Sequence, residues 1–165
     1  MAKNTIKEAL VKEYIRCSQD PVYFMRKYCF IQHPQKGKIK FELFPFQEDS
    51  LVDLKDNRFN IILKSRQMGI STLTAGYAVW NMIFREDFNV LVIAIKPATA
   101  KNLITKVRVM HEFLPSWLKV GSEEDNRLSL RFKNGSQIKA VSSAPDAARS
   151  EALSLLVIDE AAFID

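Results

Sequence analysis

The first 45 residues carry apolar positions at helical spacing and then run into a loop. The capping-box pattern TIKE predicts the start of an amphipathic helix, which Asp20-Pro21 ends. Its apolar positions are Ile6, Leu10, Val11, Tyr14 and Ile15. A second helix is predicted over 22–30, and the proline and glycine of HPQKGKIK, residues 33–40, indicate a surface loop. We therefore expect residues 1–45 to form a helical segment and loop ahead of the main domain.

From residue 46 onward, short apolar runs alternate with helical patterns. Helices are predicted over 46–55, 71–84 and 98–114, and the second of these is apolar on nearly every side, which predicts burial against a sheet. Two runs rich in β-branched residues, FNIILK at 59–64 and NVLVIAI at 89–95, predict buried strands. The order is then strand, helix, strand, helix, as in an α/β domain.

The last third of the chain adds a hairpin and a further strand. RLSLRFKNGSQIKAV alternates polar and apolar residues around Asn134-Gly135, a strong signal for a two-residue hairpin, which we expect as an antiparallel insertion that decorates the sheet. LSLLVIDE, residues 153–160, predicts a buried strand that ends on two carboxylates. Together these patterns predict a doubly wound, mainly parallel α/β sheet over 46–165, with ligands at the carboxyl ends of its strands.

Composition and charge narrow the class of protein without identifying a partner. The chain has 165 residues, of which 47% are hydrophobic, enough for one folded domain. Its formal charge of +5 is spread evenly along the chain, which permits contact with nucleic acid but does not argue for it. No apolar run is long enough to cross a membrane and no signal peptide is apparent, which predicts a cytoplasmic protein. Cys17 and Cys29 form no zinc-site or disulfide pattern, which predicts buried free thiols.

The segment KSRQMGIST lies between a predicted strand and a predicted helix, where phosphate-binding loops occur. Backbone N–H groups and the dipole at a helix start favour an anion there. Laid over GxxxxGK[ST], the segment puts Gly69 on the second glycine and Ser71 on the hydroxyl position, but Ile70 on the lysine. Lys64, at the start of the loop, and Arg66 would supply the positive charge instead. The alternative is a simple turn at Gly69 with a solvated Lys64.

Asp159 and Glu160 follow the apolar residues LLVI at the end of the last predicted strand. Asp159 is suited to hold Mg²⁺ through water, and Glu160 to orient or deprotonate an attacking water. Alone, an acidic pair at a strand end is also compatible with the start of a solvated loop. Because the loop and the acidic pair each follow a buried strand of one α/β domain, together they predict a nucleoside triphosphate site.

These segments resemble the ATPase domain of the large terminase subunit of tailed bacteriophages, the motor that packages DNA into proheads. The resemblance rests on the segments DPVYFMRKY, FELFPFQEDSL, KSRQMGIST, SSAPDAARS and LLVIDEAAF, and it extends over essentially the whole chain. It implies a P-loop NTPase fold of the ASCE/RecA-like class, in which a displaced lysine is usual. The chain departs from the family at Ser150, where glycine is more common.

Carried over residue by residue, the resemblance implies a site for ATP and Mg²⁺. Gln47 corresponds to the glutamine that recognises adenine, with an exposed helix residue as the alternative. Ser71 and Asp159 would bind the metal ion, and Glu160 would be the catalytic carboxylate. Arg149 corresponds to an arginine proposed to stabilise charge on the γ-phosphate, with a surface arginine as the alternative. The loop residues implied in nucleotide binding are Lys64, Ser65, Arg66, Gln67, Met68, Gly69, Ile70, Ser71 and Thr72.

The resemblance also implies partners. They are double-stranded DNA, the portal protein and the small terminase subunit, with assembly into a homo-oligomeric ring in the cytoplasm of the infected bacterial host. In the family a further strand lies between the phosphate-loop strand and the acidic strand, and a nuclease domain follows. We therefore expect this chain to be the N-terminal part of such a motor. A helicase-like ATPase and a non-hydrolysing nucleotide-binding module completed by a partner are the alternatives.

Overall fold

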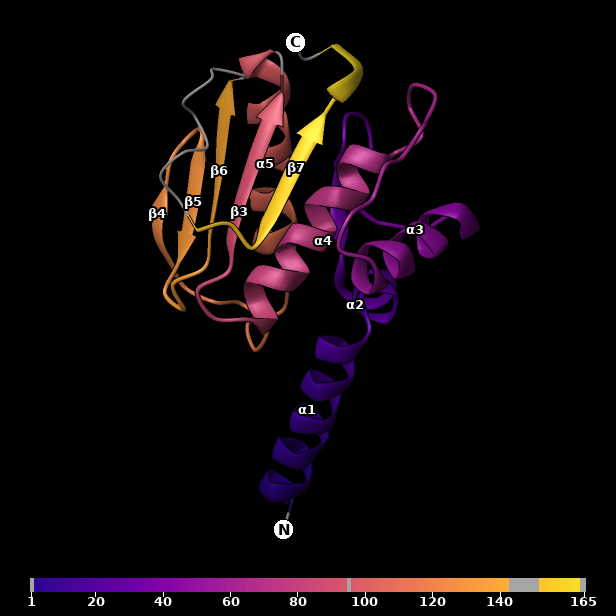
Figure 1. The fold of residues 1–165 in the computed structure, drawn as a ribbon. Coiled ribbons are helices and arrows are strands. Elements are labelled where there is room, and N and C mark those ends of the chain that lie inside the picture. The colour runs from indigo at the N-terminus through magenta and orange to yellow at the C-terminus, as the bar shows by residue number, and fades with distance from the viewer. Residues whose placement is uncertain (1, 95, 143–151, 164–165) are drawn as a thin grey trace.

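The computed structural model describes residues 2–94, 96–142 and 152–163 and shows a sheet backed by helices, with a small helical region beside it (Figure 1). The N-terminal region contains α1 (Ala2–Gln19), α2 (Pro21–Tyr28), β1 (Phe30–His33), β2 (Gly37–Lys40) and α3 (Pro45–Asp56). Asp20 caps α2, because its Oδ1 accepts a hydrogen bond from the Tyr23 N–H at 2.9 Å. The three helices predicted here are confirmed.

The predicted surface loop over 33–40 is wrong in one respect, since it contains a strand. β1 and β2 form an antiparallel pair in which Ile31 lies opposite Ile39, and Gly37 adopts a positive φ of 66° where the chain turns back. Both strands have four residues. So short a pair gives little alternation to read from sequence, and the proline and glycine of its turn dominate the pattern.

The main sheet has five strands in the order β4-β5-β6-β3-β7. Their bounds are β3 (Asn89–Ala94), β4 (Ser122–Asp125), β5 (Ser129–Phe132), β6 (Gln137–Ser142) and β7 (Leu155–Asp159). β3 pairs in parallel with β6 and β7, whereas β4–β5 and β5–β6 are antiparallel. The sheet is therefore mixed rather than mainly parallel. The predicted hairpin is part of the sheet rather than a decoration, because β6 pairs with the whole length of β3.

The hairpin between β5 and β6 turns through three residues rather than the predicted two. The Phe132 N–H donates to Ser136 O at 2.8 Å and the Gly135 N–H donates to Phe132 O at 3.0 Å, with Gly135 at φ +82°. This is the arrangement in which a left-handed glycine closes a three-residue loop. Asn134 is used elsewhere, since its Nδ2 donates to Met82 O at 2.8 Å and to Arg85 O at 3.0 Å, which holds the turn against the end of a helix.

Two helices cover one face of the sheet. α4 (Ile70–Phe84) and α5 (Pro97–Phe113) pack on each other and against the face that carries Val90, Val92 and Ala94; in Figure 1 α5 is seen behind the sheet and α4 runs beside and below β7. α4 is buried along most of its length, as its apolar sequence predicts. On the opposite face, Leu156 and Ile158 of β7 are 46% and 47% exposed. Over the described residues the sheet is thus backed on one side and not doubly wound.

The predicted strand over 59–64 is wrong. These residues form no strand in the structure, and Ile61 and Leu63 are fully exposed to solvent. A strand needs a neighbour to bond its backbone, and β7, the strand at that end of the sheet, pairs only with β3 among the described residues. β7 itself is half-exposed rather than buried, because no described helix covers the face of the sheet that carries Leu156 and Ile158.

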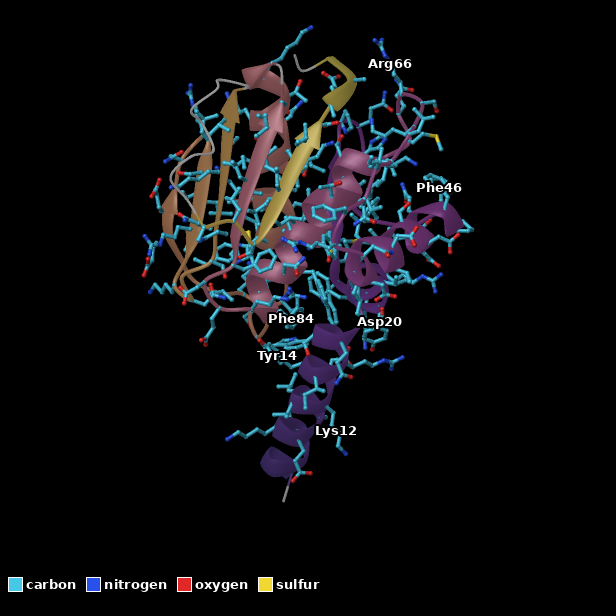
Figure 2. All side chains as sticks on the ribbon, viewed as in Figure 1. Lys12, Tyr14, Asp20, Phe46, Arg66 and Phe84 are labelled. Atoms are coloured by element: carbon cyan, nitrogen blue, oxygen red, sulfur yellow. The ribbon has the colours of Figure 1, made fainter. Side chains whose placement is uncertain are left out.

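α1 projects from the body of the molecule and is fixed to it near its C-terminal end (Figures 1 and 2). The buried Trp80 of α4 donates its indole N–H to Cys17 O at 2.7 Å. The Tyr14 ring meets the Phe84 ring edge-on with centroids 4.9 Å apart. Cys17 and Cys29 are buried free thiols, as predicted. Residues 6–12 of α1 are exposed to solvent, and they include the apolar Ile6.

Candidate functional site

The loop that precedes α4 turns sharply onto the start of the helix. Gly69 occupies the N-cap position with a left-handed backbone at φ +72°, and its carbonyl accepts the N–H groups of Thr72 and Leu73 at 3.0 and 2.9 Å. Gln67 has a positive φ of 63° as well. The left-handed conformation favours glycine, which accounts for Gly69 in this sequence. The side chains of residues 64–68 are exposed, whereas that of Ile70, the first residue of α4, is buried.

The structure brings the two halves of the predicted site together. The Ser71 hydroxyl, in the first turn of α4, donates to Asp159 Oδ2 at 3.0 Å, although 88 positions separate the two residues. The other carboxylate oxygen, Oδ1, accepts the backbone N–H of Glu160 at 3.1 Å. Glu160 has a positive φ of 59° and its side chain is exposed, directly after the end of β7. A hydroxyl, a carboxylate and a second acidic side chain therefore lie beside one helix start.

A lysine that sequence reasoning missed interacts electrostatically with two of the predicted site residues. Lys106 of α5 is half-buried, and burial lowers its pKa; the Asp159 carboxylate opposes that effect and Lys64 adds to it. Lys106 therefore shares an electrostatic environment with one predicted residue from the strand end and one from the loop. A single lysine on a helix carries no local signal of this kind, because only the packing of α5 brings it to the site. The exposed Arg66 lies on the loop that rises above α4 in Figure 2.

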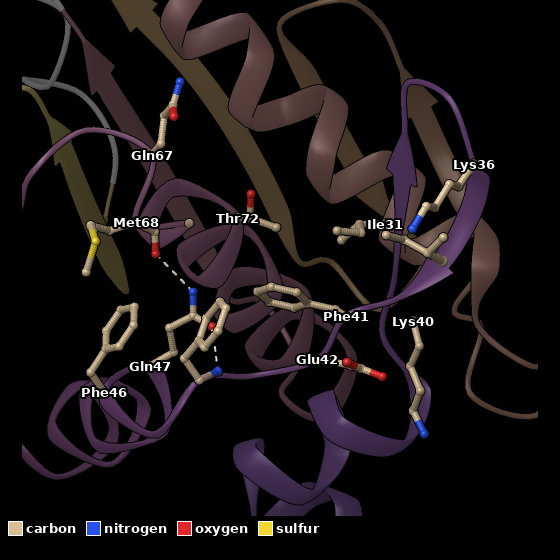
Figure 3. A pocket seen from close by; sticks show the side chains of 13 residues that line it. Ile31, Lys36, Lys40, Phe41, Glu42, Phe46, Gln47, Gln67, Met68 and Thr72 are labelled. Carbon is tan, nitrogen blue, oxygen red and sulfur yellow. Dashed lines mark hydrogen bonds between the residues drawn. The ribbon is translucent and has the colours of Figure 1, made fainter.

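A cavity of about 670 Å³ opens beside the loop (Figure 3). One wall comes from β1, β2 and the segment that follows them, including Lys36, Lys40 and Glu42, and another from Gln67, Met68, Gly69 and Thr72 of the loop and α4. At the start of α3, the exposed rings of Phe44 and Phe46 stack with centroids 5.8 Å apart. The volume of the cavity falls within the range of ligand pockets in proteins.

Gln47 lines this cavity but has almost no exposed surface. Only 2% of the residue is accessible, and both ends of its amide are bonded within the protein. Its Oε1 accepts the Phe44 N–H at 3.1 Å and its Nε2 donates to Met68 O at 3.0 Å, as the dashed lines of Figure 3 show. It is not the exposed helix residue of the alternative interpretation. Arg149, the remaining predicted residue, lies outside the described residues.

The groups present suit a magnesium nucleotide. A phosphate chain is accommodated by backbone N–H groups at a helix start with nearby lysine and arginine side chains. Mg²⁺ prefers few protein oxygens and completes its shell with water and phosphate oxygens, and Ser71 and Asp159 supply two oxygens in contact. Within the described part of the chain no group of three or more His, Cys, Asp or Glu side chains forms a metal site of another kind.

Two comparisons with known proteins agree with this arrangement. A family model described as "Terminase large subunit, T4likevirus-type, N-terminal" matches residues 61–165, which include both the loop and the acidic pair. The crystal structure of the HK97 bacteriophage large terminase superposes with a TM-score of 0.66 at 17% sequence identity, over 86% of this chain and 30% of that one. At this identity the likeness concerns the fold. The chain spans 30% of the length of the HK97 protein. Among the described helices, none is long and apolar enough to cross a membrane.

Proposed function

The chain belongs to the family of phage large terminase subunits and matches the N-terminal region of these proteins. From this membership we propose that it binds and hydrolyses Mg-ATP in a DNA-packaging motor. The observation that carries the proposal is the hydrogen bond of 3.0 Å between Ser71 and Asp159. This bond places the start of α4 against the end of β7, where the two acidic residues lie. The proposed fold class is a P-loop NTPase of the ASCE/RecA-like type.

The roles of the residues follow from their chemistry and position. Lys64 and Arg66 are the exposed positive charges of the loop and neutralise the phosphates, while the N–H groups at the start of α4 donate hydrogen bonds to the same anion. Ser71 and Asp159 would hold Mg²⁺, which when bound draws charge from the phosphate oxygens. Glu160, exposed beside Asp159, orients the attacking water and takes its proton. Arg149 is proposed to approach the γ-phosphate.

The wider role is proposed on family membership alone. We propose that hydrolysis drives double-stranded DNA into the prohead, with the portal protein and the small terminase subunit as partners. The working form would be a homo-oligomeric ring in the cytoplasm of the infected bacterium. The chain's modest positive charge is compatible with contact to DNA but is not concentrated in any one segment of the sequence.

Equilibrium binding of Mg-ATP, measured by calorimetry, tests the proposal. We expect the wild-type chain to bind, and Lys64→Ala to bind about tenfold or more weakly, because a hydrogen bond to a charged group contributes about 1.5–3 kcal/mol. Lys12→Ala is the matched control, since Lys12 is an exposed lysine of α1 far from the loop (Figure 2). Absence of binding to the wild-type chain, or equal binding by the two variants, would overturn the proposed loop.

A further inference from the structure

The cavity beside the loop adjoins the proposed phosphate site. Thr72 lines the cavity, and its neighbour Ser71, in the same turn of α4, donates to Asp159 Oδ2 at 3.0 Å. Gly69, the N-cap residue of that helix, lines the cavity as well. A nucleotide whose phosphates bind at the start of α4 therefore has this cavity as the adjoining space for its sugar and base.

The lining of the cavity suits a nucleoside better than a phosphate chain. Ile31 and Ile39 lie opposite each other on β1 and β2 and give one wall an apolar surface. The exposed rings of Phe44 and Phe46 add aromatic surface at the start of α3. Such surface packs against a base, whereas a triphosphate requires N–H donors and cations. A charged side chain on the apolar wall is therefore not explained by the phosphates.

Lys36 is such a side chain. It comes from the turn between β1 and β2 and lines the cavity; in Figure 3 it points from that turn toward Ile31 and Thr72, whereas Lys40 points away from the loop. Among the described residues, none forms a hydrogen bond or an ion pair with its ammonium group. An ammonium group carries three N–H donors, so all three are available to a ligand in the cavity.

The turn that carries Lys36 is held in place by its own contacts. The N–H groups of Gln35 and Lys36 both donate to His33 Nδ1, at 3.2 and 3.1 Å. Two positions further along, Lys38 Nζ lies 4.7 Å from the centre of the Phe113 ring, which attaches β2 to α5. The Lys36 side chain therefore extends toward the cavity from a fixed backbone.

We propose that Lys36 is a binding residue for the nucleoside half of the nucleotide, and that its ammonium group donates hydrogen bonds to the sugar or base across the cavity. This inference rests on the proposed function, because it takes the phosphates to bind at the start of α4. Sugar hydroxyls and ring nitrogens are the acceptors. Lys36 therefore strengthens binding of a nucleotide but not of inorganic polyphosphate, whereas Lys64 and Arg66 serve both ligands.

Three variants separate a contact from a general effect of charge. Lys36→Met removes the ammonium group and keeps an unbranched side chain, and Lys36→Arg keeps the charge and N–H donors. Lys38→Met is the matched control, because it removes the same charge from the same pair of strands at an exposed position that does not line the cavity. Since both lysines are exposed, we expect all three variants to fold, and circular dichroism checks this.

The first measurement compares the binding of Mg-ATP and of magnesium tripolyphosphate by calorimetry. Lys36→Met is expected to weaken Mg-ATP about threefold to tenfold and to leave tripolyphosphate within about twofold, while Lys36→Arg and Lys38→Met stay within about twofold for both ligands. Unchanged affinity of Lys36→Met for Mg-ATP overturns the inference. Equal weakening of both ligands by Lys36→Met, or of Mg-ATP by Lys38→Met, also overturns it, because charge alone would then explain the effect.

The second measurement is reductive methylation of the wild-type lysines, followed by mass spectrometry. Saturating Mg-ATP is expected to slow methylation of Lys36 about threefold or more and to leave Lys38 unchanged, since an ammonium group held in hydrogen bonds reacts only when they open. Magnesium tripolyphosphate should protect neither lysine. Binding of Mg-ATP without protection of Lys36 contradicts the inference alone. If the wild-type chain binds neither ligand, the proposed function fails and the inference fails with it.

Discussion

Replacement of Glu13 by glutamine is expected to lower the free energy of unfolding at pH 7 by about 2 kcal/mol. Glu13 joins α1 to α2, since its Oε1 accepts hydrogen bonds from Lys27 Nζ at 2.8 Å, Tyr23 OH at 2.8 Å and Tyr28 OH at 2.7 Å. The Lys27 bond, with the two tyrosine hydroxyls, holds the pKa of Glu13 at about 2 instead of 4.5. At 1.36 kcal/mol per pKa unit, this lowering of the pKa corresponds to about 3 kcal/mol of stabilisation. The Glu13 side chain is 22% exposed, and screening by solvent reduces the stabilisation to about 2 kcal/mol.

The effect of Glu13→Gln depends on pH in a fixed direction. Because the pKa of Glu13 is lower in the folded than in the unfolded chain, the carboxylate stabilises the fold fully above about pH 4.5 and loses this effect as the pH falls toward 2. The difference between wild type and variant should therefore be constant from pH 6 to 8 and fall below roughly half its full value by pH 3.

Urea denaturation followed by circular dichroism at pH 7 and pH 3 measures this difference. At pH 7 the melting temperature should fall by about 4–8 °C. Glu8→Gln is the control, because Glu8 is an exposed glutamate on the same helix without any of these partners. A loss no larger than that of Glu8→Gln, or a loss of the same size at pH 3, would refute the assignment of the stabilisation to the ionised carboxylate.

Three further substitutions test other parts of the structure. Glu160→Gln should leave the affinity for Mg-ATP within about twofold and reduce phosphate release to background, since binding uses the loop and hydrolysis uses the positioned water; unchanged release would remove Glu160 from that role. Gly69→Ala should lower the free energy of unfolding in urea by at least about 1–2 kcal/mol, because the φ of +72° at this position disfavours alanine and the added Cβ would meet Gln47. A smaller loss of stability would show that the loop shifts easily. Ile61→Lys should change the free energy of unfolding by less than about 0.5 kcal/mol and reduce self-association in sedimentation, because Ile61 is fully exposed; a large loss of stability would mean that 59–64 is buried after all.

The local signals of the sequence predicted the five described α-helices and four strands of the main sheet, β3, β5, β6 and β7. Asp20-Pro21 fixes the boundary between α1 and α2, and the apolar runs of β3 and β7 identify two parallel neighbours. The contact between Ser71 and Asp159 was also expected from the sequence, although the strand predicted ahead of α4 does not form; the start of α4 reaches the carboxyl end of β7 all the same. These features share a property: each depends on residues close together in the chain or on a general rule of sheet topology.

The features that sequence missed depend on packing between distant elements. Lys106 belongs to the site only because α5 lies against the sheet, and nothing within a turn of it in the sequence distinguishes it from other helix lysines. Gln47 was identified from its motif, but its motif does not reveal that Met68 O and Phe44 N–H already occupy its amide. Side-chain type predicts which bonds a residue is able to make, whereas the fold determines which partners reach it first.

The segment 59–64 shows where hydrophobic pattern and strand formation separate. Its apolar run is as good a strand signal as that of β3, yet β3 has a bonded strand on each side and 59–64 has none among the described residues. Each backbone N–H and C=O of a strand must be bonded by a neighbour or by water, so an apolar sequence alone does not make a strand. An apolar pattern indicates which side chains would stabilise the fold by being buried, but Ile61 and Leu63 are fully exposed in this structure. The Ile61→Lys experiment therefore tests a part of the fold in which sequence and structure disagree.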